Sequence, residues 1–395
     1  MGVIRPEILT WARETAGLSL EDAAQALGLK EVRGQTGTER LAALEAGTGE
    51  PSRPLLLKMS QAYRRPLLVF YLNQPPKTGD RGQDFRTLPG PERYNPELDA
   101  LIRDIKGRLG LIRSMLEDAE SEPIDFIGTA TMEMPVASLA TRAAERMHFA
   151  LAEYRAEKTH DAAFAYLRSK IEASGVFVLL LGNLGSHHTN IPVGIFRGFA
   201  VSDMIAPLIV INDQDARAAW SFTALHELAH LWLGDTGISG PEATNRVEQH
   251  CNDVAGEILL PAKELVAFPK VVTLQKAITE ISEFAEARRL SRPMVAYKLL
   301  RAGVINKPMW SELSAHFHTE WLAFRQRQTE RQRASESGPS YYVVRRHRVG
   351  PALLGLVRRS LDEGNITYTK ASRVLGVKPR NVEPLLFSGV MRGVR

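Results

Sequence analysis

The chain has 395 residues, 44% of them hydrophobic, and a formal net charge of +5. This length is enough for two or three domains that each bury a core. No apolar run reaches the roughly 18 residues needed to span a bilayer, and charges interrupt the N-terminus where a signal peptide needs an apolar stretch. We therefore expect a cytoplasmic protein with no membrane contact. The single cysteine, Cys251, excludes a disulfide framework and a cysteine-rich zinc site, and we expect it in the core.

The first 73 residues carry short helical patterns separated by turn residues. Ser19 can cap a helix, because Asp22 follows three positions later and apolar residues then recur at helical spacing until Gly28. A further helix is expected at about Thr38 to Ala46, before the next glycine. These patterns predict a compact all-helical module at 1–73.

A connector and a mixed domain follow this module. Residues 74–134 are expected to form a connector and a helical linker, because proline and glycine are frequent at 71–91. An α+β domain is expected at 135–262, with helices and two short runs rich in β-branched residues, at 176–181 and 206–211. The second run could present an edge to which an extended substrate adds as another strand. An ordinary core strand explains that run equally well.

The remaining chain is helical and becomes basic. A helical region is expected at 263–323, and a basic linker with a C-terminal helical unit at 324–395. The polar composition of 324–339 is typical of a flexible linker. From Arg325 to Arg395 there are 15 Lys and Arg residues against 5 Asp and Glu residues. Such a block can bind nucleic acid or an acidic partner, although a solvated face is the commoner explanation.

The segment His226-Glu227-Leu228-Ala229-His230 has the HExxH spacing. Positions four apart lie one turn above each other on a helix, so two imidazoles can converge on one Zn²⁺. The two histidines and Glu227 fall within an arc of about 100°. The surrounding helix, 218–233, is apolar nearly all round and should be buried, where polar groups need partners. The pattern predicts a zinc site, and the alternative is a pair of hydrogen-bonded core histidines.

A catalytic zinc site needs a third protein ligand and an open position. The longer metzincin pattern fails, because Leu233 and Thr236 stand where its glycine and third histidine would be. The downstream candidates are Asp235, Glu242, Glu248, His250, Asp253 and Glu257.

A helix expected around 245–260 separates these candidates. Its apolar residues project into one arc of about 140°, which should be the buried face. Glu248 and Asn252 lie within or beside that arc, whereas His250, Asp253 and Glu257 point away from it. We therefore select Glu248, as the buried carboxylate, for the third ligand, and we expect Asn252 to support the ligands or the packing.

The predicted ligand set implies a mechanism. Zinc lowers the pKa of bound water toward neutrality, and Glu227 would take the proton as the water attacks a carbonyl carbon. The same carboxyl would then deliver the proton to the leaving amine. We therefore expect amide hydrolysis without a covalent enzyme intermediate.

The segments FTALHELAHLWLG and VEQHCNDVAGEILLP resemble the ImmA/IrrE metallopeptidases. Carried over position by position, His226, His230 and Glu248 match the zinc ligands of that family, and Glu227 matches its catalytic glutamate. The segments QDFRTLPG, FRGFAVSD and APLIVIND also look like family blocks. The resemblance implies a zincin-like α+β domain with a small sheet that cleaves helix-turn-helix repressors or other regulatory proteins, in stress or mobile-element responses.

The N-terminal residues look like an Xre-type helix-turn-helix domain, through ARETAGLSLEDAAQALGL and RLAALEAG. The turn before the second helix is lengthened by Lys30–Gly37. The side chains that could contact DNA are Arg33, Gln35, Thr36, Thr38 and Arg40. Because residues 1–70 carry nine Lys and Arg against eight Asp and Glu, a purely protein-binding role is the alternative.

Two further segments, 287–305 and 365–386, also have a helix-turn-helix pattern, which simple helical hairpins explain about as well. The leading hypothesis is a zinc endopeptidase that acts on a regulatory protein, with DNA as a further partner of the N-terminal module or the basic tail, and with oligomers allowed. One alternative is an antitoxin-like DNA-binding regulator whose metal domain senses or scaffolds. Another is hydrolysis of a non-peptide amide or ester.

Overall fold

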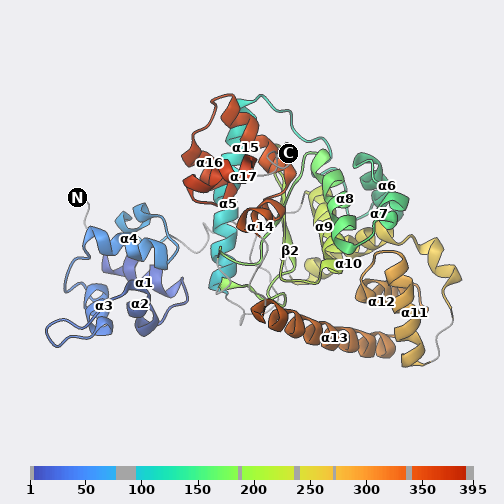
Figure 1. Ribbon diagram of the computed structural model, residues 1–395, viewed down its shortest axis with the longest axis horizontal. Helices are drawn as coiled ribbons and strands as arrows, with labels where there is room; N and C mark the ends of the chain where they lie inside the picture. Colours follow the sequence, from blue (N-terminus) through green and yellow to red (C-terminus); the bar gives the residue numbers. More distant parts are fainter. Residues whose placement is uncertain are drawn as a thin grey trace. The chain divides into compact units, whose positions relative to one another are not determined.

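The computed structural model describes residues 4–76, 95–185, 189–234, 241–269, 273–334 and 340–387 (Figure 1). The chain divides into two compact units. The first comprises residues 1–105 and 183–189, and the second comprises 106–182 and 190–395. Within the described ranges, no helix is both long enough and apolar enough to cross a membrane.

The first unit is built from short helices around a small core. Its helices are α1 (Pro6–Glu14), α2 (Leu20–Leu27), α3 (Gly37–Glu45), α4 (Arg53–Ala62) and η1 (Leu67–Tyr71), followed by the start of α5 (Pro96–Asp118). The predicted cap of α2 is confirmed, since the Ser19 hydroxyl accepts the Asp22 N–H at 3.0 Å. Gly28 ends this helix in the left-handed conformation, with φ 64°. Between α2 and α3, the backbones of Val32 and Gln35 pair in both directions, so the inserted residues form a tight hairpin turn.

The second unit contains a small sheet and the remaining helices. Before and within the sheet region lie α6 (Val136–Arg146), α7 (Leu151–Ala156), α8 (His160–Ala173), β1 (Phe177–Leu180), β2 (Gly198–Val201), β3 (Leu208–Ile211), α9 (Arg217–Leu233) and α10 (Pro241–Leu259). After it come η4 (Ala262–Ala267), α11 (Leu274–Ala287), α12 (Arg292–Arg301), α13 (Lys307–Ala334), α14 (Tyr341–Val349), α15 (Pro351–Asp362), α16 (Tyr368–Leu375), η5 (Pro379–Asn381) and α17 (Val382–Phe387). The mostly helical composition with a small sheet confirms the expected α+β class.

The sheet has the strand order β1-β3-β2. Strand β3 pairs in parallel with β1, with Phe177 opposite Leu208, and antiparallel with β2, with Gly198 opposite Ile211. All four residues of β3 are buried. The expectation that β3 offers an edge to a substrate is therefore wrong, because both of its edges are already paired and it is an ordinary core strand. The two edge strands are β1, in the predicted run at 176–181, and β2, which the sequence does not predict as a strand.

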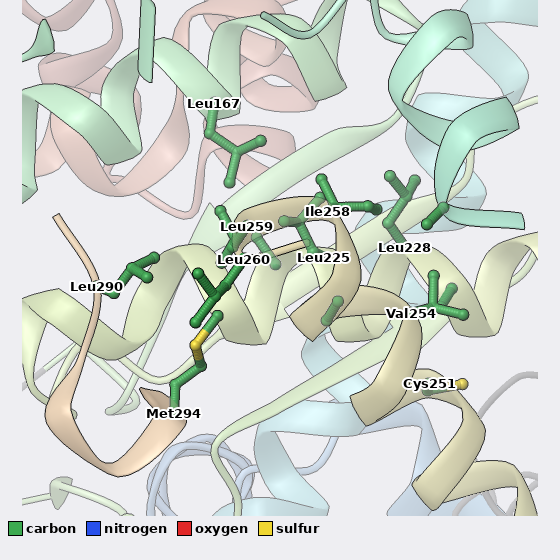
Figure 2. Close-up of a cluster of buried hydrophobic side chains, with 14 of the residues drawn as sticks. Leu167, Leu225, Leu228, Cys251, Val254, Ile258, Leu259, Leu260, Leu290 and Met294 are labelled. Carbon is green, nitrogen blue, oxygen red and sulfur yellow. The ribbon is translucent and has the colours of Figure 1, made fainter. Parts of the chain in front are cut away.

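Helix α9 packs against α8, α10 and the strands β2 and β3. Figure 2 shows Leu225 and Leu228 of α9 together with Val254 and Ile258 of α10 in one buried cluster. Cys251 belongs to the same cluster and is fully buried, as expected. Because the apolar residues of α9 face several neighbours at once, this helix is held firmly at the centre of the unit.

The interpretation of 324–334 as a flexible linker is wrong, because α13 continues to Ala334. Arg, Gln, Glu and Ala, which dominate this stretch, all have high helix propensity. The Gln326 amide donates a hydrogen bond to Glu330 at 3.2 Å, one turn further on. A solvated helix and a linker share the same polar composition, so composition alone could not separate them. Residues 335–339 lie outside the described part of the chain.

A buried arginine joins the C-terminal helices to the sheet. The Arg168 side chain of α8 is only 4% exposed and pairs with Glu172 at 3.0 Å. Its guanidinium also donates to the carbonyls of Val178 in β1 and His347 in α14. Glu172 in turn accepts the Ala352 N–H at 3.1 Å, at the start of α15. These bonds tie α14 and α15 to the core, since each buried charge depends on its partners.

We expect Gly350→Ala to lower the free energy of unfolding by about 1–3 kcal/mol. Gly350 joins α14 to α15 with φ 88° and ψ 152°, a conformation that is essentially restricted to glycine. An added Cβ would also meet the Arg168 and Glu172 side chains. Thermal or denaturant unfolding of the full chain measures the effect.

The matched control is Gly355→Ala, in the middle of α15. An added Cβ there would meet only the Arg359 side chain, at 3.6 Å. Since alanine is the better helix former, this variant should keep or raise stability by about 0.5–1 kcal/mol. Equal stability of the two variants would contradict the role given to Gly350.

Candidate metal centre

Helix α9 carries three of the four predicted site residues, His226, Glu227 and His230. The helix ends at Gly234, which is left-handed with φ 70°. The side chains of the two histidines are 12% and 3% exposed, so both rings lie in or near the interior. Burial of α9 by its apolar residues thus places two imidazoles and a carboxylate where each needs a partner.

Three donor groups converge at one point. His226 Nε2 lies 3.1 Å from His230 Nε2, and the two Glu248 oxygens lie 3.1 Å and 3.3 Å from these nitrogens. A tetrahedral ion with bonds of about 2.0–2.1 Å separates its ligand atoms by about 3.3 Å. The observed spacing therefore fits one tetrahedral ion that has three protein ligands and a fourth position left over. His226, His230 and Glu248 form the group of potential metal ligands in the described part of the chain.

Glu248 comes from α10, as predicted, but it is not buried. Its side chain is 44% exposed, so the expectation of a buried carboxylate is wrong. The helical spacing correctly predicts the direction of the Glu248 side chain. However, the buried part of α10 begins only at Cys251, its first fully buried described residue. Partial burial raises the pKa of the Glu248 carboxyl, whereas hydrogen bonds and charge from His226 and His230 lower it more, so its pKa lies well below the usual range. The ionised Glu248 carboxylate is thus the donor group of the site that faces solvent.

Two of the other candidate ligands on α10 are paired with residues outside the site. Asp253 accepts hydrogen bonds from the Tyr297 hydroxyl and pairs with Arg301, at 2.9 Å and 2.7 Å. Glu257 pairs with Lys298 at 2.8 Å. His250 is part-buried, and burial lowers the pKa of its ring. Asp235 and the Glu242 side chain lie outside the described residues, and Asn252 is half-buried, one turn from Glu248.

Glu227 lies beneath strand β2 and is only 5% exposed. The Ala200 N–H donates a hydrogen bond to its carboxylate. A Cβ at Gly198 would lie 2.9 Å from Glu227 Oε1 and 2.6 Å from Thr223 Cγ2, so only glycine leaves room for the carboxylate. Burial raises the pKa of the Glu227 carboxyl, and the neighbouring His226 and His230 oppose that shift only in part. A raised pKa suits a group that must accept and return a proton.

Gly198 and Ala200 were not identified as site residues from the sequence. The segment FRGFAVSD resembles a family block, but nothing in its spacing connects it to a helix that begins at Arg217. The available signal is the glycine itself, because a glycine within a strand often marks a close approach of another group.

The residues predicted to contact DNA lie between α2 and α3 and at the start of α3. Arg33 and Gln35 are exposed in the hairpin turn. Thr36 caps α3 through a reciprocal pair of hydrogen bonds with Glu39, and the Arg40 guanidinium donates to the Lys30 carbonyl at 2.8 Å. Thr38 is half-buried in the first turn of the helix. DNA binding by this module stays a prediction.

We expect the full chain to bind one Zn²⁺. Loss of a residue that only supports a ligand weakens metal affinity by about 10–100-fold, and we expect His230→Ala to weaken zinc affinity by more than this. His250→Ala removes the same atoms from the same region and should leave zinc binding unchanged. Metal content after dialysis and competition with a chelator measure both variants. Equal zinc affinity of the two variants would exclude the proposed ligand set.

Comparison with known proteins agrees with this geometry. No curated protein and no solved structure gives a match to the chain. A sequence model of a peptidase family does match, over residues 183–300, which include β2, β3, α9 and α10. Its description is IrrE N-terminal-like domain, and this part of the chain is therefore a metallopeptidase-like domain of that type.

Proposed function

We propose that the chain is a zinc-dependent endopeptidase that cleaves a helix-turn-helix repressor or another regulatory protein. One observation carries the proposal: the buried carboxylate of Glu227 adjoins three donor groups that are spaced for one tetrahedral ion. Zinc is favoured because two imidazoles and one carboxylate form a common catalytic set for this ion.

The residues of the chain divide the chemistry between them. A zinc ion, when bound, supplies a Lewis acid that polarises carbonyls and acidifies water. Glu227 accepts the proton of the attacking water and later delivers it to the leaving amine. The Ala200 N–H and the absence of a side chain at Gly198 hold the Glu227 carboxylate in place. No covalent bond between enzyme and substrate is needed.

The position of β2 supports a polypeptide substrate. This strand is at the edge of the sheet, and its Ala200 contacts the proposed base. An extended peptide can add to such an edge through main-chain hydrogen bonds, which places a backbone carbonyl next to the base. A small non-peptide amide would make no use of the strand, so the arrangement favours an endopeptidase.

A regulatory protein is the substrate class that the family resemblance implies. Known relatives in the ImmA/IrrE family cleave helix-turn-helix repressors, and the metallopeptidase-like domain of this chain is linked to further helical units. Cleavage of such a repressor would release transcription in response to stress or to a mobile element.

We expect Glu227→Gln to reduce peptide-bond cleavage by about 10²–10⁴-fold while zinc remains bound, because the amide cannot accept the proton. The zinc-loaded full chain and the variant are incubated with a library of proteome-derived peptides, and new termini are identified by mass spectrometry. Equal cleavage by both proteins would end the proposal. If neither protein cleaves any peptide although both bind zinc, a regulator whose metal site only senses or scaffolds is favoured.

We expect Gly198→Ala to lower the cleavage rate by about 10²-fold without loss of zinc, because displacement of a catalytic group by about 1 Å can have that effect. The control is Gly194→Ala, where a Cβ would meet nothing within 4 Å. Rates and zinc content are measured for both variants. A Gly198→Ala variant that cleaves as fast as the control would contradict the positioning role.

A further inference from the structure

Helices α14 to α17 form a small helical unit with its own apolar core. The buried residues of its last three helices and connecting turns are Leu353, Leu356, Val357, Ile366, Ala371, Val374, Leu375, Val382, Leu385 and Leu386. Within it, α16 ends at Leu375, the following Gly376 is left-handed with φ 63°, and η5 starts at Pro379. Only three residues therefore separate α16 from the following helical segment. This is a helix, a tight turn and a second helix.

The first half of this segment repeats the pattern of α2. Thr367 caps α16 through the Lys370 N–H at 3.2 Å, as Ser19 caps α2, and a left-handed glycine ends each helix nine residues after the cap. The buried positions also correspond. Ala371, Ser372 and Leu375 take the places of Ala23, Ala24 and Leu27.

The two segments differ beyond this glycine. After Gly28 the chain inserts a hairpin turn, and α3 begins only at Gly37. After Gly376 only Val377 and Lys378 precede η5. DNA-binding helix-turn-helix motifs use a turn of three or four residues, which sets the recognition helix beside the first helix. The C-terminal segment meets this requirement, whereas the N-terminal segment does not.

The two segments also differ in net charge, and the C-terminal segment is again the one that suits DNA. Residues 367–387 contain four Lys and Arg against one Glu, whereas residues 19–45 contain three Lys and Arg against five Asp and Glu. Lys378 and Arg380, at the turn and the start of the second helix, are exposed. A net positive surface is the electrostatic requirement for contact with a phosphate backbone.

The hydroxyl groups at the start of α16 add to this surface. Tyr368 is 50% exposed and Thr369 is also exposed. Lys370 instead points to α5, where it donates to the Ser114 hydroxyl at 3.3 Å, so α5 covers a different side of α16. The exposed acid of α17, Glu383, can accept a hydrogen bond from a cytosine amino group.

We propose that α16, the turn at 376–378 and the η5–α17 segment form a helix-turn-helix motif that binds duplex DNA. Tyr368 and Thr369 donate hydrogen bonds to the phosphate backbone, and Lys378 and Arg380, at the entry of the second helix into the major groove, pair with its phosphates. The inference does not depend on the peptidase activity, because none of these residues belongs to the metal centre. It assigns the DNA contact of the chain to its C-terminal unit instead of to the N-terminal module.

The test measures binding of the zinc-loaded full chain to a fluorescent random-sequence 30-base-pair duplex, as fluorescence anisotropy over a range of salt concentrations. The test variant is Lys378→Gln with Arg380→Gln. The matched control is Lys30→Gln with Arg33→Gln, which removes the same charge from exposed residues at the corresponding turn of the N-terminal segment. Thermal unfolding of each variant checks that the fold is kept.

We expect the test variant to bind about tenfold or more weakly and to reduce the slope of log affinity against log salt by about two, while the control binds like the wild type. Glu227→Gln should also bind like the wild type, which separates this proposal from the proposed peptidase. Failure of the wild type to bind the duplex, equal binding by the test variant, or a loss confined to the control would each overturn the proposal. Failure of the wild type to bind the duplex would favour an acidic protein as the partner of the basic surface.

Discussion

Two imidazoles and a carboxylate on a helix that is otherwise apolar impose the main constraint on this molecule. Helix α9 has to be buried because Leu225, Leu228 and their apolar neighbours stabilise the second unit, yet burial removes water from His226, Glu227 and His230. Unpaired polar groups in such surroundings cost several kcal/mol. The fold supplies partners from two directions: the Glu248 carboxylate from α10 for the Nε2 atoms of the histidines, and the Ala200 N–H from β2 for Glu227. The contacts that offset the free-energy cost of removing water from these groups also assemble the site. Stability and chemistry therefore depend on the same partners.

The C-terminal unit is attached by a second set of buried polar groups. Arg168 is nearly inaccessible, and desolvation lowers the pKa of its guanidinium, which makes its bonds to Glu172 and to the carbonyls of β1 and α14 necessary. A guanidinium offers five donors in a fixed plane, so this one side chain can join the helices α8 and α14 and the strand β1. The edge of β1 is thereby occupied from within the chain.

The sequence predicted most of the features that depend on local spacing. The HExxH helix, the cap at Ser19 and the choice of Glu248 all derive from helical periodicity, which fixes the direction of a side chain. Depth below the surface is a property of packing, and the 44% exposure of Glu248 could not be obtained from the helical arc. The end of α13 could not be predicted either, because a solvated helix and a linker have the same composition. The contact between Ala200 and Glu227 could not be predicted because only the tertiary fold brings β2 and α9 together.

Strand β2 is only four residues long, and this limits what the edge of the sheet can recognise. In an antiparallel ladder, alternate residues exchange pairs of hydrogen bonds. Because the Ala200 N–H is already bonded to Glu227, this strand can form only about one complete pair with an added chain. Main-chain bonds of this kind hold almost any extended sequence equally well. If the chain is the endopeptidase proposed above, selection of one target protein has to arise away from the scissile bond, through contacts that raise the effective concentration of enzyme and target.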